Sequence, residues 1–265
     1  LFFYLKSKKI KFSCITRKKK DSLYLKNFEN ISKLKKMIND ENPTHLVNCL
    51  GVTKFSKSYS LVKQTKFINT VFPKKIAKFC LKKKIFFIHI STDCVFSGKK
   101  GNYLETSKKD AKDLYGKTKA MGEVKNTYCS TIRTSFIGPE TKTKKSLLNW
   151  FLSQKKKVNG YDQAFFSGLT SLELSKIIYK FFLTKNKHFN KIFNVSGYKI
   201  SKFLLLLKIK KVFKKRISII KSSSFKLDRS LNSYKFRKSS SYKIKNWNKM
   251  LDELKLFMEE NNYKF

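Results

Sequence analysis

Short apolar runs alternate along this chain with segments whose apolar residues recur every three or four positions. The runs at 44–51, 84–90 and 129–137 predict strands, and 84–90 is apolar almost throughout, as expected of a strand covered on both faces of a parallel sheet. The helical spacing at 30–39 and 67–80 predicts helices between them, the second kinked at Pro73. Strands alternating with helices predict an α/β fold built on a doubly wound parallel sheet.

The two ends of the chain carry weaker patterns. Residues 1–8 are amphipathic and predict a helix, and the alternation over 10–15 predicts a strand. After Pro139 the pattern predicts further elements, namely helices at 146–154, 172–181 and 247–254, a turn at Asn159-Gly160 and a short strand at 191–197. Residues 200–245 are rich in lysine and serine, and we assign no element there.

Composition restricts the partners that we expect. A chain of 265 residues can form one full-sized domain, or a domain with a small second lobe. The net charge of +44 comes from 61 basic residues, of which only five are arginine, whereas a specific nucleic-acid reader would be expected to use arginine heavily. The lysines are also scattered. We therefore predict compositional drift in a genome rich in A and T, with no specific nucleic-acid partner; binding to a polyanion is the alternative.

Cysteine and histidine usage points away from disulfides and metals. The five cysteines are widely spaced with no Cys-x-x-Cys pair, and the three histidines form no ligand motif. This is the pattern of reduced thiols in a cytoplasmic protein without a metal site. No apolar run reaches the length that spans a membrane, so we expect no membrane partner.

Tyr115 and Lys119 are the strongest candidates for chemistry. Four residues apart on a predicted helix, they share one face, and a cation beside a phenol favours its ionised form. The same spacing recurs elsewhere, for example at Tyr234/Lys238, so context must decide. Just upstream, the buried strand 84–90 ends in Ser91-Thr92-Asp93, where open α/β sheets place their ligand sites.

These residues belong to a longer series of blocks, which follow one another at 48–52, 69, 91–98, 101–105, 113–123, 133–138 and 227–232. The series resembles the dTDP-4-dehydrorhamnose reductase family of the extended short-chain dehydrogenase/reductases. The resemblance implies a Rossmann-like fold with a small C-terminal substrate-binding lobe. Residues 1–138 would form the NAD(P)-binding domain and residues 139–265 mainly the substrate lobe, with segments that return to the core.

The resemblance also implies a function. It is the NADPH- or NADH-dependent reduction of a 4-keto nucleotide sugar, with dTDP-4-dehydrorhamnose converted to dTDP-L-rhamnose for surface polysaccharide as the expected reaction. Tyr115 would protonate the alkoxide, Lys119 would lower the pKa of Tyr115 and bind the nicotinamide ribose, and Thr92 would orient the carbonyl oxygen. The expected cofactor-binding residues also include Arg17, Lys18, Asn48, Gly51 and Ser91. The expected substrate-binding residues are Asn69, Asp93, Val95, Phe96 and Arg229.

Several of these roles have structural alternatives. Arg17 and Lys18, expected to meet the 2′-phosphate of NADPH, could be a solvated basic turn; Asn69 could bond only to the backbone. Arg229, expected at a diphosphate, could be a surface charge. Cys94 departs from the family, which often has tyrosine after Ser-Thr-Asp, so the reaction class is better supported than the particular sugar.

The family opens with a Gly-x-x-Gly-x-x-Gly loop that binds the pyrophosphate, and these 265 residues contain no such loop. We expect the natural chain to be longer at its N-terminus; loss of the loop is the alternative. The other functions left open are a reductase or epimerase acting on another nucleotide sugar, and a non-catalytic NADP-binding regulatory homologue. A homodimer is one possible assembly.

Overall fold

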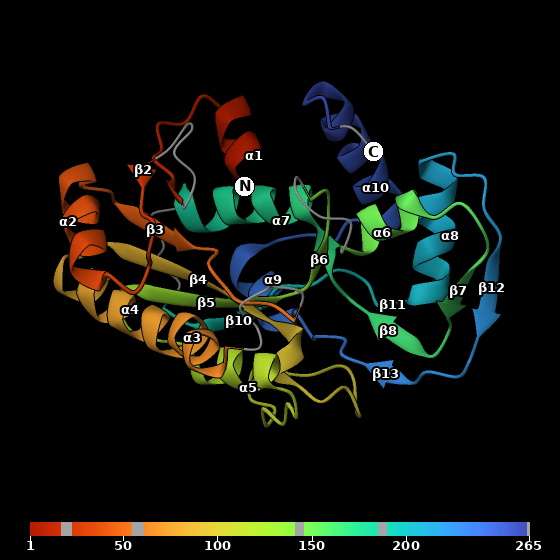
Figure 1. Cartoon of the computed structure of the whole chain (residues 1–265), viewed down its shortest axis with the longest axis horizontal. Coiled ribbons are helices and arrows are strands. Elements are labelled where there is room, and N and C mark those ends of the chain that lie inside the picture. The colour runs from red at the N-terminus through yellow and green to blue at the C-terminus, as the bar shows by residue number, and fades with distance from the viewer. Residues whose placement is uncertain (17–22, 55–60, 141–145, 185–189, 264–265) are drawn as a thin grey trace.

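The computed structural model describes residues 1–16, 23–54, 61–140, 146–184 and 190–263. A parallel sheet of four strands in the order β10–β5–β4–β3 lies at the centre of the left half of the molecule in Figure 1. Its strands are β3 (His45–Asn48), β4 (Phe86–Thr92), β5 (Cys129–Thr134) and β10 (Ile192–Asn194). β10 comes from the second half of the chain and pairs with β5, so the C-terminal half contributes an edge of this sheet.

Helices cover both faces of the sheet because its strands are apolar on both faces. On one face, Phe87 and Cys129 pack in a cluster with Leu34 of α2 and Ile76 of α4. On the other face, residues such as Ile88 join a larger cluster that includes α7 and α10. The bounds of these helices are α2 (Ile31–Glu41), α4 (Phe72–Lys82), α7 (Ser171–Ile177) and α10 (Trp247–Glu260). The predicted α/β fold with a doubly wound parallel sheet is confirmed.

Between β3 and β4 the chain is helical from Val62 to Lys82, but its geometry changes along the way. It begins as α3 (Val62–Lys66), becomes π-helical over Phe67–Val71, and continues as α4. The π-helical turn ends at Val71, two residues before Pro73, which has no N–H to donate. Asn69 lies within this turn, so the irregularity expected at Pro73 also sets the position of a candidate site residue.

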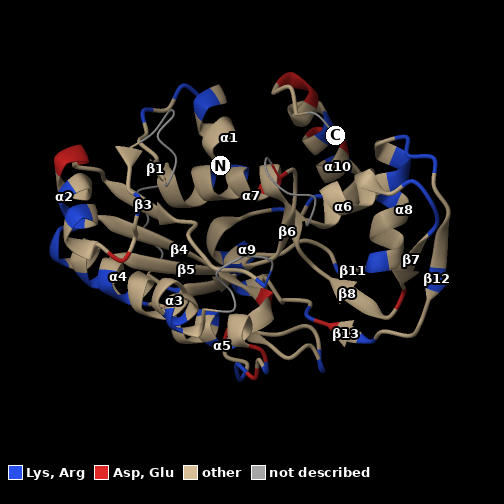
Figure 2. Ribbon diagram, in the orientation of Figure 1, with Lys and Arg blue, Asp and Glu red and all other residues tan. Residues whose placement is uncertain are grey.

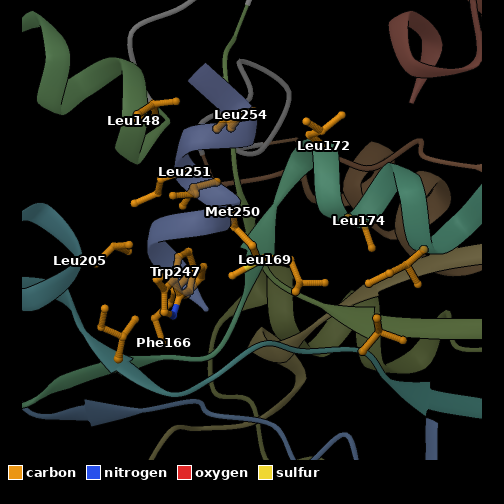
Figure 3. Packing of buried hydrophobic residues seen from close by; sticks show 14 of the residues in the cluster. Leu148, Phe166, Leu169, Leu172, Leu174, Leu205, Trp247, Met250, Leu251 and Leu254 are labelled. Carbon is orange, nitrogen blue, oxygen red and sulfur yellow. The ribbon is translucent and has the colours of Figure 1, made fainter. Parts of the chain in front are cut away.

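The right half of Figure 1 holds small sheets and the helices that pack on them. The strands pair as β11–β8–β13, β12–β7 and β6–β9. The helices here are α6 (Leu147–Ser153) and α8 (Lys202–Val212), whereas α9 (Tyr234–Ser240) contacts β10 of the central sheet. The strands are β6 (Phe136–Ile137), β7 (Val158–Tyr161), β8 (Ala164–Phe166), β9 (Leu169–Thr170), β11 (Ile200–Ser201), β12 (Ile219–Ser222) and β13 (Leu227–Asp228). Figure 3 shows α10 at the centre of the shared core, where Trp247 lies beside Phe166 and Leu251 lies between α6 and α8.

Two local predictions were wrong. Residues 10–15 do not form a strand: α1 (Phe2–Ser7) is followed by irregular chain, and only Ile15–Thr16 (β1) pairs, with the equally short β2 (Leu23–Tyr24). Asn159-Gly160 is not a turn but the middle of β7, paired with β12. A Cβ on Gly160 would lie 2.8 Å from the Phe203 ring, so glycine here permits α8 to pack closely on the strand.

Lysine and arginine are spread over the helices and loops of the whole visible fold, including α2, α4 and α8 (Figure 2). In the parts of the chain that the structure describes, no helix combines the length and the apolar character needed to cross a membrane. Within the same described ranges, no three His, Cys, Asp or Glu side chains group in a way that could hold a metal ion.

Candidate active site

The candidate site is built where β4 ends and α5 (Leu114–Met121) begins. Thr92, the last residue of β4, accepts a hydrogen bond from the Cys94 N–H at 3.1 Å and donates one to Asp93 Oδ1 at 3.1 Å. Asp113 caps α5 by accepting the Gly116 N–H at 2.8 Å, a favoured arrangement at a helix start. Both ends of the site are therefore anchored by local side-chain hydrogen bonds.

Gly116 lets the helix approach the turn after β4. A Cβ at this position would lie 2.2 Å from the Cys94 carbonyl oxygen, so any larger residue would push α5 away. The close approach brings the Tyr115 side chain near Thr92, which favours the ionised form of the phenol. The structure thus brings two of the three predicted catalytic residues, Thr92 and Tyr115, close together.

The expected effect on the pKa of Tyr115 is not what the structure shows. Burial raises the pKa of Tyr115 above its usual value, and the nearby Cys94, Asp93 and Asp113 raise it further, against the opposing effect of Thr92. The prediction that this pKa would be lowered was wrong, because it considered the helix neighbour and not the surrounding carboxyl groups and burial. Tyr115 is therefore protonated at neutral pH, the state in which it can donate a proton.

Lys119 is buried, with 3% of its surface exposed, and its Nζ donates to the Ile90 carbonyl oxygen at 2.7 Å. Burial lowers the pKa of Lys119 to about 8, while Glu123 and Cys49 oppose the shift. The ammonium is thus held against the backbone of β4, beside the candidate site. Its lowered pKa means that it begins to lose its proton just above neutral pH.

Three predicted cofactor residues lie at the end of β3, just after β3, or in β4. The Asn48 amide contacts His89 Nδ1 at 3.0 Å and accepts the Leu50 N–H at 3.0 Å. Gly51 is exposed just beyond the carboxyl end of β3. Ser91 is buried and donates its hydroxyl hydrogen to Glu123 Oε1 at 3.0 Å. Arg17 and Lys18, which were also predicted to bind the cofactor, lie outside the described residues.

The Asn69 amide is fully occupied by the protein. It accepts the Val52 N–H at 2.9 Å and donates to the Val52 carbonyl oxygen at 3.0 Å and to Thr118 Oγ1 at 3.1 Å. The residue has no exposed surface. It connects the segment after β3 to α5, so the structure shows how it positions the site, and a substrate contact remains a prediction.

The other predicted substrate residues surround the turn after β4. Asp93 is buried beside Thr92. Val95 and Phe96 are fully buried in a small cluster with Tyr103 and Leu231. The Phe96 and Tyr103 rings stack with their centres 4.2 Å apart. Val95 and Phe96 thus pack in the interior beneath the turn after β4 and are not exposed to solvent.

Arg229 reaches the same turn from far along the chain. Its Nη1 donates to Cys94 Sγ at 3.3 Å, and its Nη2 lies 4.0 Å from Asp113 Oδ2. Its Nε is buried and has no hydrogen-bond partner among the described residues. Arg229 is thus not merely a surface charge: it places a guanidinium group, whose Nε has no hydrogen-bond partner among the described residues, at the turn after β4.

Three residues at the site, Glu123, Arg133 and Lys202, were not predicted from the sequence. Glu123 and Arg133 form a buried ion pair behind Lys119, with 2.7 Å between Arg133 Nε and Glu123 Oε1. Lys202, the first residue of α8, lies with its Nζ 4.1 Å from the centre of the Phe166 ring, and Asp93 and Cys94 act on its charge. Glu123 and Arg133 stood in blocks that we quoted, but nothing in the sequence showed that they pair.

Comparison with known proteins agrees with this geometry. The family model described as the RmlD substrate binding domain matches residues 3–160, more than half of the chain. The chain belongs to this family. A dTDP-4-keto-6-deoxy-D-glucose reductase of Streptomyces niveus is 30% identical over 88 residues, which are 33% of this chain and 31% of that protein. The match therefore spans less than a third of the curated relative.

Solved structures of family members share the fold. A hypothetical dTDP-4-dehydrorhamnose reductase of Sulfolobus tokodaii is 23% identical, with a TM-score of 0.74 and 89% of each chain covered. A dTDP-4-dehydrorhamnose reductase of Bacillus anthracis, solved in complex with NADP, is 18% identical, with a TM-score of 0.76, covering 87% of this chain and 86% of that one. At these identities the likeness establishes the Rossmann-like fold.

The residues at the carboxyl ends of β3 and β4 fit the nicotinamide half of a dinucleotide cofactor. The protonated Tyr115 and the Lys119 ammonium are hydrogen-bond donors of the kind that a ribose and a carbonyl oxygen accept. The exposed Gly51 has nothing closer to a built Cβ than Asn69 Oδ1 at 3.6 Å, so a ligand can reach the backbone there.

Proposed function

We propose that this protein reduces a 4-keto nucleotide sugar with NADPH, and that dTDP-4-dehydrorhamnose is the substrate. The observation that carries the proposal is the juxtaposition of Thr92, Tyr115 and Lys119 at the carboxyl end of β4, in a chain of this family. The ligand sites of open α/β sheets lie at this end. The name of the Streptomyces niveus relative, a reductase of a dTDP-4-keto sugar, supports the same substrate class.

Reduction converts a ketone to an alcohol by adding hydride to carbon and a proton to oxygen. When bound, a reduced nicotinamide supplies the hydride. Tyr115 donates its hydroxyl proton to the developing alkoxide oxygen and is left as a phenolate, which takes up a proton from solvent after turnover. Thr92, whose hydroxyl lies near Tyr115, orients the carbonyl oxygen. The Lys119 ammonium stabilises the negative charge that develops on the phenolate and holds the ribose.

The cations from the C-terminal half would bind the diphosphate of the sugar nucleotide. Arg229 has a buried Nε without a partner among the described residues, and its guanidinium has the fork geometry that phosphate oxygens match. Lys202 adds a second positive charge near Asp93. Cys94 accepts from Arg229 Nη1, and burial raises the pKa of Cys94 to about 12, so it would meet the sugar as a neutral thiol.

The test is turnover of the Tyr115→Phe variant in the natural gene product, with NADPH and dTDP-4-dehydrorhamnose. Loss of the acid should lower kcat by about 10²–10⁴-fold while the far-UV circular dichroism spectrum stays unchanged. Tyr234→Phe is the matched control, because Tyr234 is exposed and also stands four residues before a lysine, Lys238. Full activity of Tyr115→Phe would contradict the assignment.

A panel of 4-keto nucleotide sugars separates the proposed substrate from its alternatives. Turnover of another sugar but not dTDP-4-dehydrorhamnose would keep the reaction class and replace the substrate. Tight NADPH binding without turnover of any 4-keto sugar would favour the non-catalytic regulatory homologue.

A further inference from the structure

Glu123 is a carboxylate in an unfavourable place. It stands just past the C-terminus of α5, where the helix dipole favours cations, and its side chain is 1% exposed. A buried charge at the negative end of a helix costs free energy unless strong partners compensate it. Glu123 has such partners, and they come from three other parts of the chain.

The partners fix both carboxylate oxygens of Glu123. Arg133 of β5 donates from Nε to Oε1 at 2.7 Å and from Nη2 to Oε2 at 2.8 Å. Ser91 of β4 donates to Oε1 at 3.0 Å, and Lys109 donates to Oε2 at 3.1 Å. Four hydrogen bonds from three side chains hold this carboxylate in one orientation.

That orientation places a negative charge near Lys119. Glu123 accepts the Ser91 hydroxyl while Lys119 donates to the carbonyl oxygen of the preceding residue, Ile90, so both side chains reach the same end of β4, and Glu123 acts on the charge of Lys119. Lys119 needs such support because it is almost fully buried and, within the described residues, its ammonium donates to the Ile90 carbonyl oxygen, which cannot supply a full charge. The other titratable groups that act on Lys119 are Cys49, after β3, and His89, in β4.

Neither of these groups can replace Glu123 at neutral pH. Burial, and then the Lys119 charge, lower the pKa of His89 well below its usual value, so His89 stays neutral. Burial raises the pKa of the Cys49 thiol, so it also stays uncharged. Glu123, whose pKa Arg133 and Lys109 hold below its usual range against the cost of burial, is the group that remains ionised.

We propose that Glu123 is a positioning residue that, braced by Arg133 and Ser91, keeps Lys119 in its ammonium form at the end of β4. This rests on the proposed function, in which charged Lys119 stabilises the phenolate of Tyr115. The pair thereby sets the alkaline limit of the reaction, although neither residue needs to touch the substrate or the cofactor.

The direct test follows Lys119 by NMR of protein labelled with ¹³C at the lysine Cε. The Lys119 signal is the one that Lys119→Arg removes. In the wild type it should titrate near pH 8. In Glu123→Gln it should titrate lower by about one pH unit or more, because the supporting charge is gone. The alkaline limb of kcat should move to lower pH by the same amount, and Glu123→Asp should restore most of it.

Two further variants keep this test decisive. If Glu123→Gln leaves Arg133 unpaired and fails to fold, Glu123→Gln/Arg133→Met removes both charges and should shift the Lys119 titration in the same direction by a smaller amount, because loss of the Arg133 cation partly offsets loss of the carboxylate. Glu259→Gln is the matched control, since Glu259 also lies four residues after a lysine, at 3.6 Å from Lys255 Nζ, but is half exposed. An unchanged Lys119 titration in the folded variants would overturn the proposal. Because the NMR titration needs no substrate, it tests the role of Glu123 even if the proposed reaction is not observed.

Discussion

Replacing Arg133 with methionine removes one side of a buried ion pair while keeping much of the side-chain volume. Arg133 is 2% exposed, and besides Glu123 it donates to the Glu105 carbonyl oxygen at 3.0 Å and lies 5.2 Å from the centre of the Phe96 ring. Removing one partner of a buried pair typically costs about 3–5 kcal/mol, because the other charge is left uncompensated.

The structure predicts that the loss of stability in Arg133→Met lies in the lower part of this range. Glu123 keeps Lys109, whose Nζ is 3.1 Å away on a side chain that is 36% exposed, and it keeps the Ser91 hydroxyl. We therefore expect the free energy of unfolding to fall by about 3–4 kcal/mol. For a chain of this size the melting temperature would drop by roughly 6–16 °C. Arg216→Met, at an exposed arginine, should change stability by less than about 0.5 kcal/mol.

The effect should also depend on pH. Since the folded-state pKa of Glu123 is lowered, its stabilising contribution is fully present above the unfolded-state value of about 4.3 and is lost as the pH falls through the folded-state value. The deficit of Arg133→Met should therefore be largest near neutral pH and smaller in acid. Urea titrations at several pH values measure it.

A double-mutant cycle gives the sharpest check of this reasoning. Glu123→Gln/Arg133→Met should recover much of the loss, because replacing both members of a buried pair is often nearly neutral. An Arg133→Met variant within about 1 kcal/mol of the wild type, or a double variant less stable than Arg133→Met, would refute the account of this pair.

Three other predictions follow from the site. Asn69→Ala should lower the free energy of unfolding by about 2–4 kcal/mol in a urea titration, because it leaves the buried Val52 N–H and carbonyl without partners; wild-type stability would contradict this. Thr92→Val should lower kcat more than it raises KM, because it removes the hydroxyl that orients the carbonyl oxygen; a change in KM alone would argue against that role. Wild-type kcat should decline above about pH 8 as Lys119 loses its proton, and a flat profile to pH 10 would show that its charge is not required.

The strands and the reaction geometry could be predicted from the sequence because their signals are local. The apolar run at 84–90 became β4, and the Ser91-Thr92-Asp93 segment lies at its carboxyl end, as parallel sheets require. The Tyr-x-x-x-Lys spacing alone was uninformative, since Tyr234/Lys238 has it too. What distinguished Tyr115 was the buried strand immediately upstream.

The rest depended on contacts between distant segments. Nothing near Glu123 in the sequence shows that Arg133 and Ser91 converge on it, and Arg229 stands 135 residues from Cys94. The pKa of Tyr115 was predicted in the wrong direction for the same reason. Its burial and its carboxyl neighbours are set by packing, which the spacing to Lys119 does not report.

Deuterium transfer tests the central claim most directly. The natural gene product would be mixed with dTDP-4-dehydrorhamnose and NADPH that carries deuterium at the transferable position of the nicotinamide ring, and the product sugar would be examined by NMR. The account predicts a reduced sugar with deuterium at C4, formed by the wild type and Tyr234→Phe and nearly absent with Tyr115→Phe. Formation of no labelled product by a folded protein that binds both ligands would contradict it.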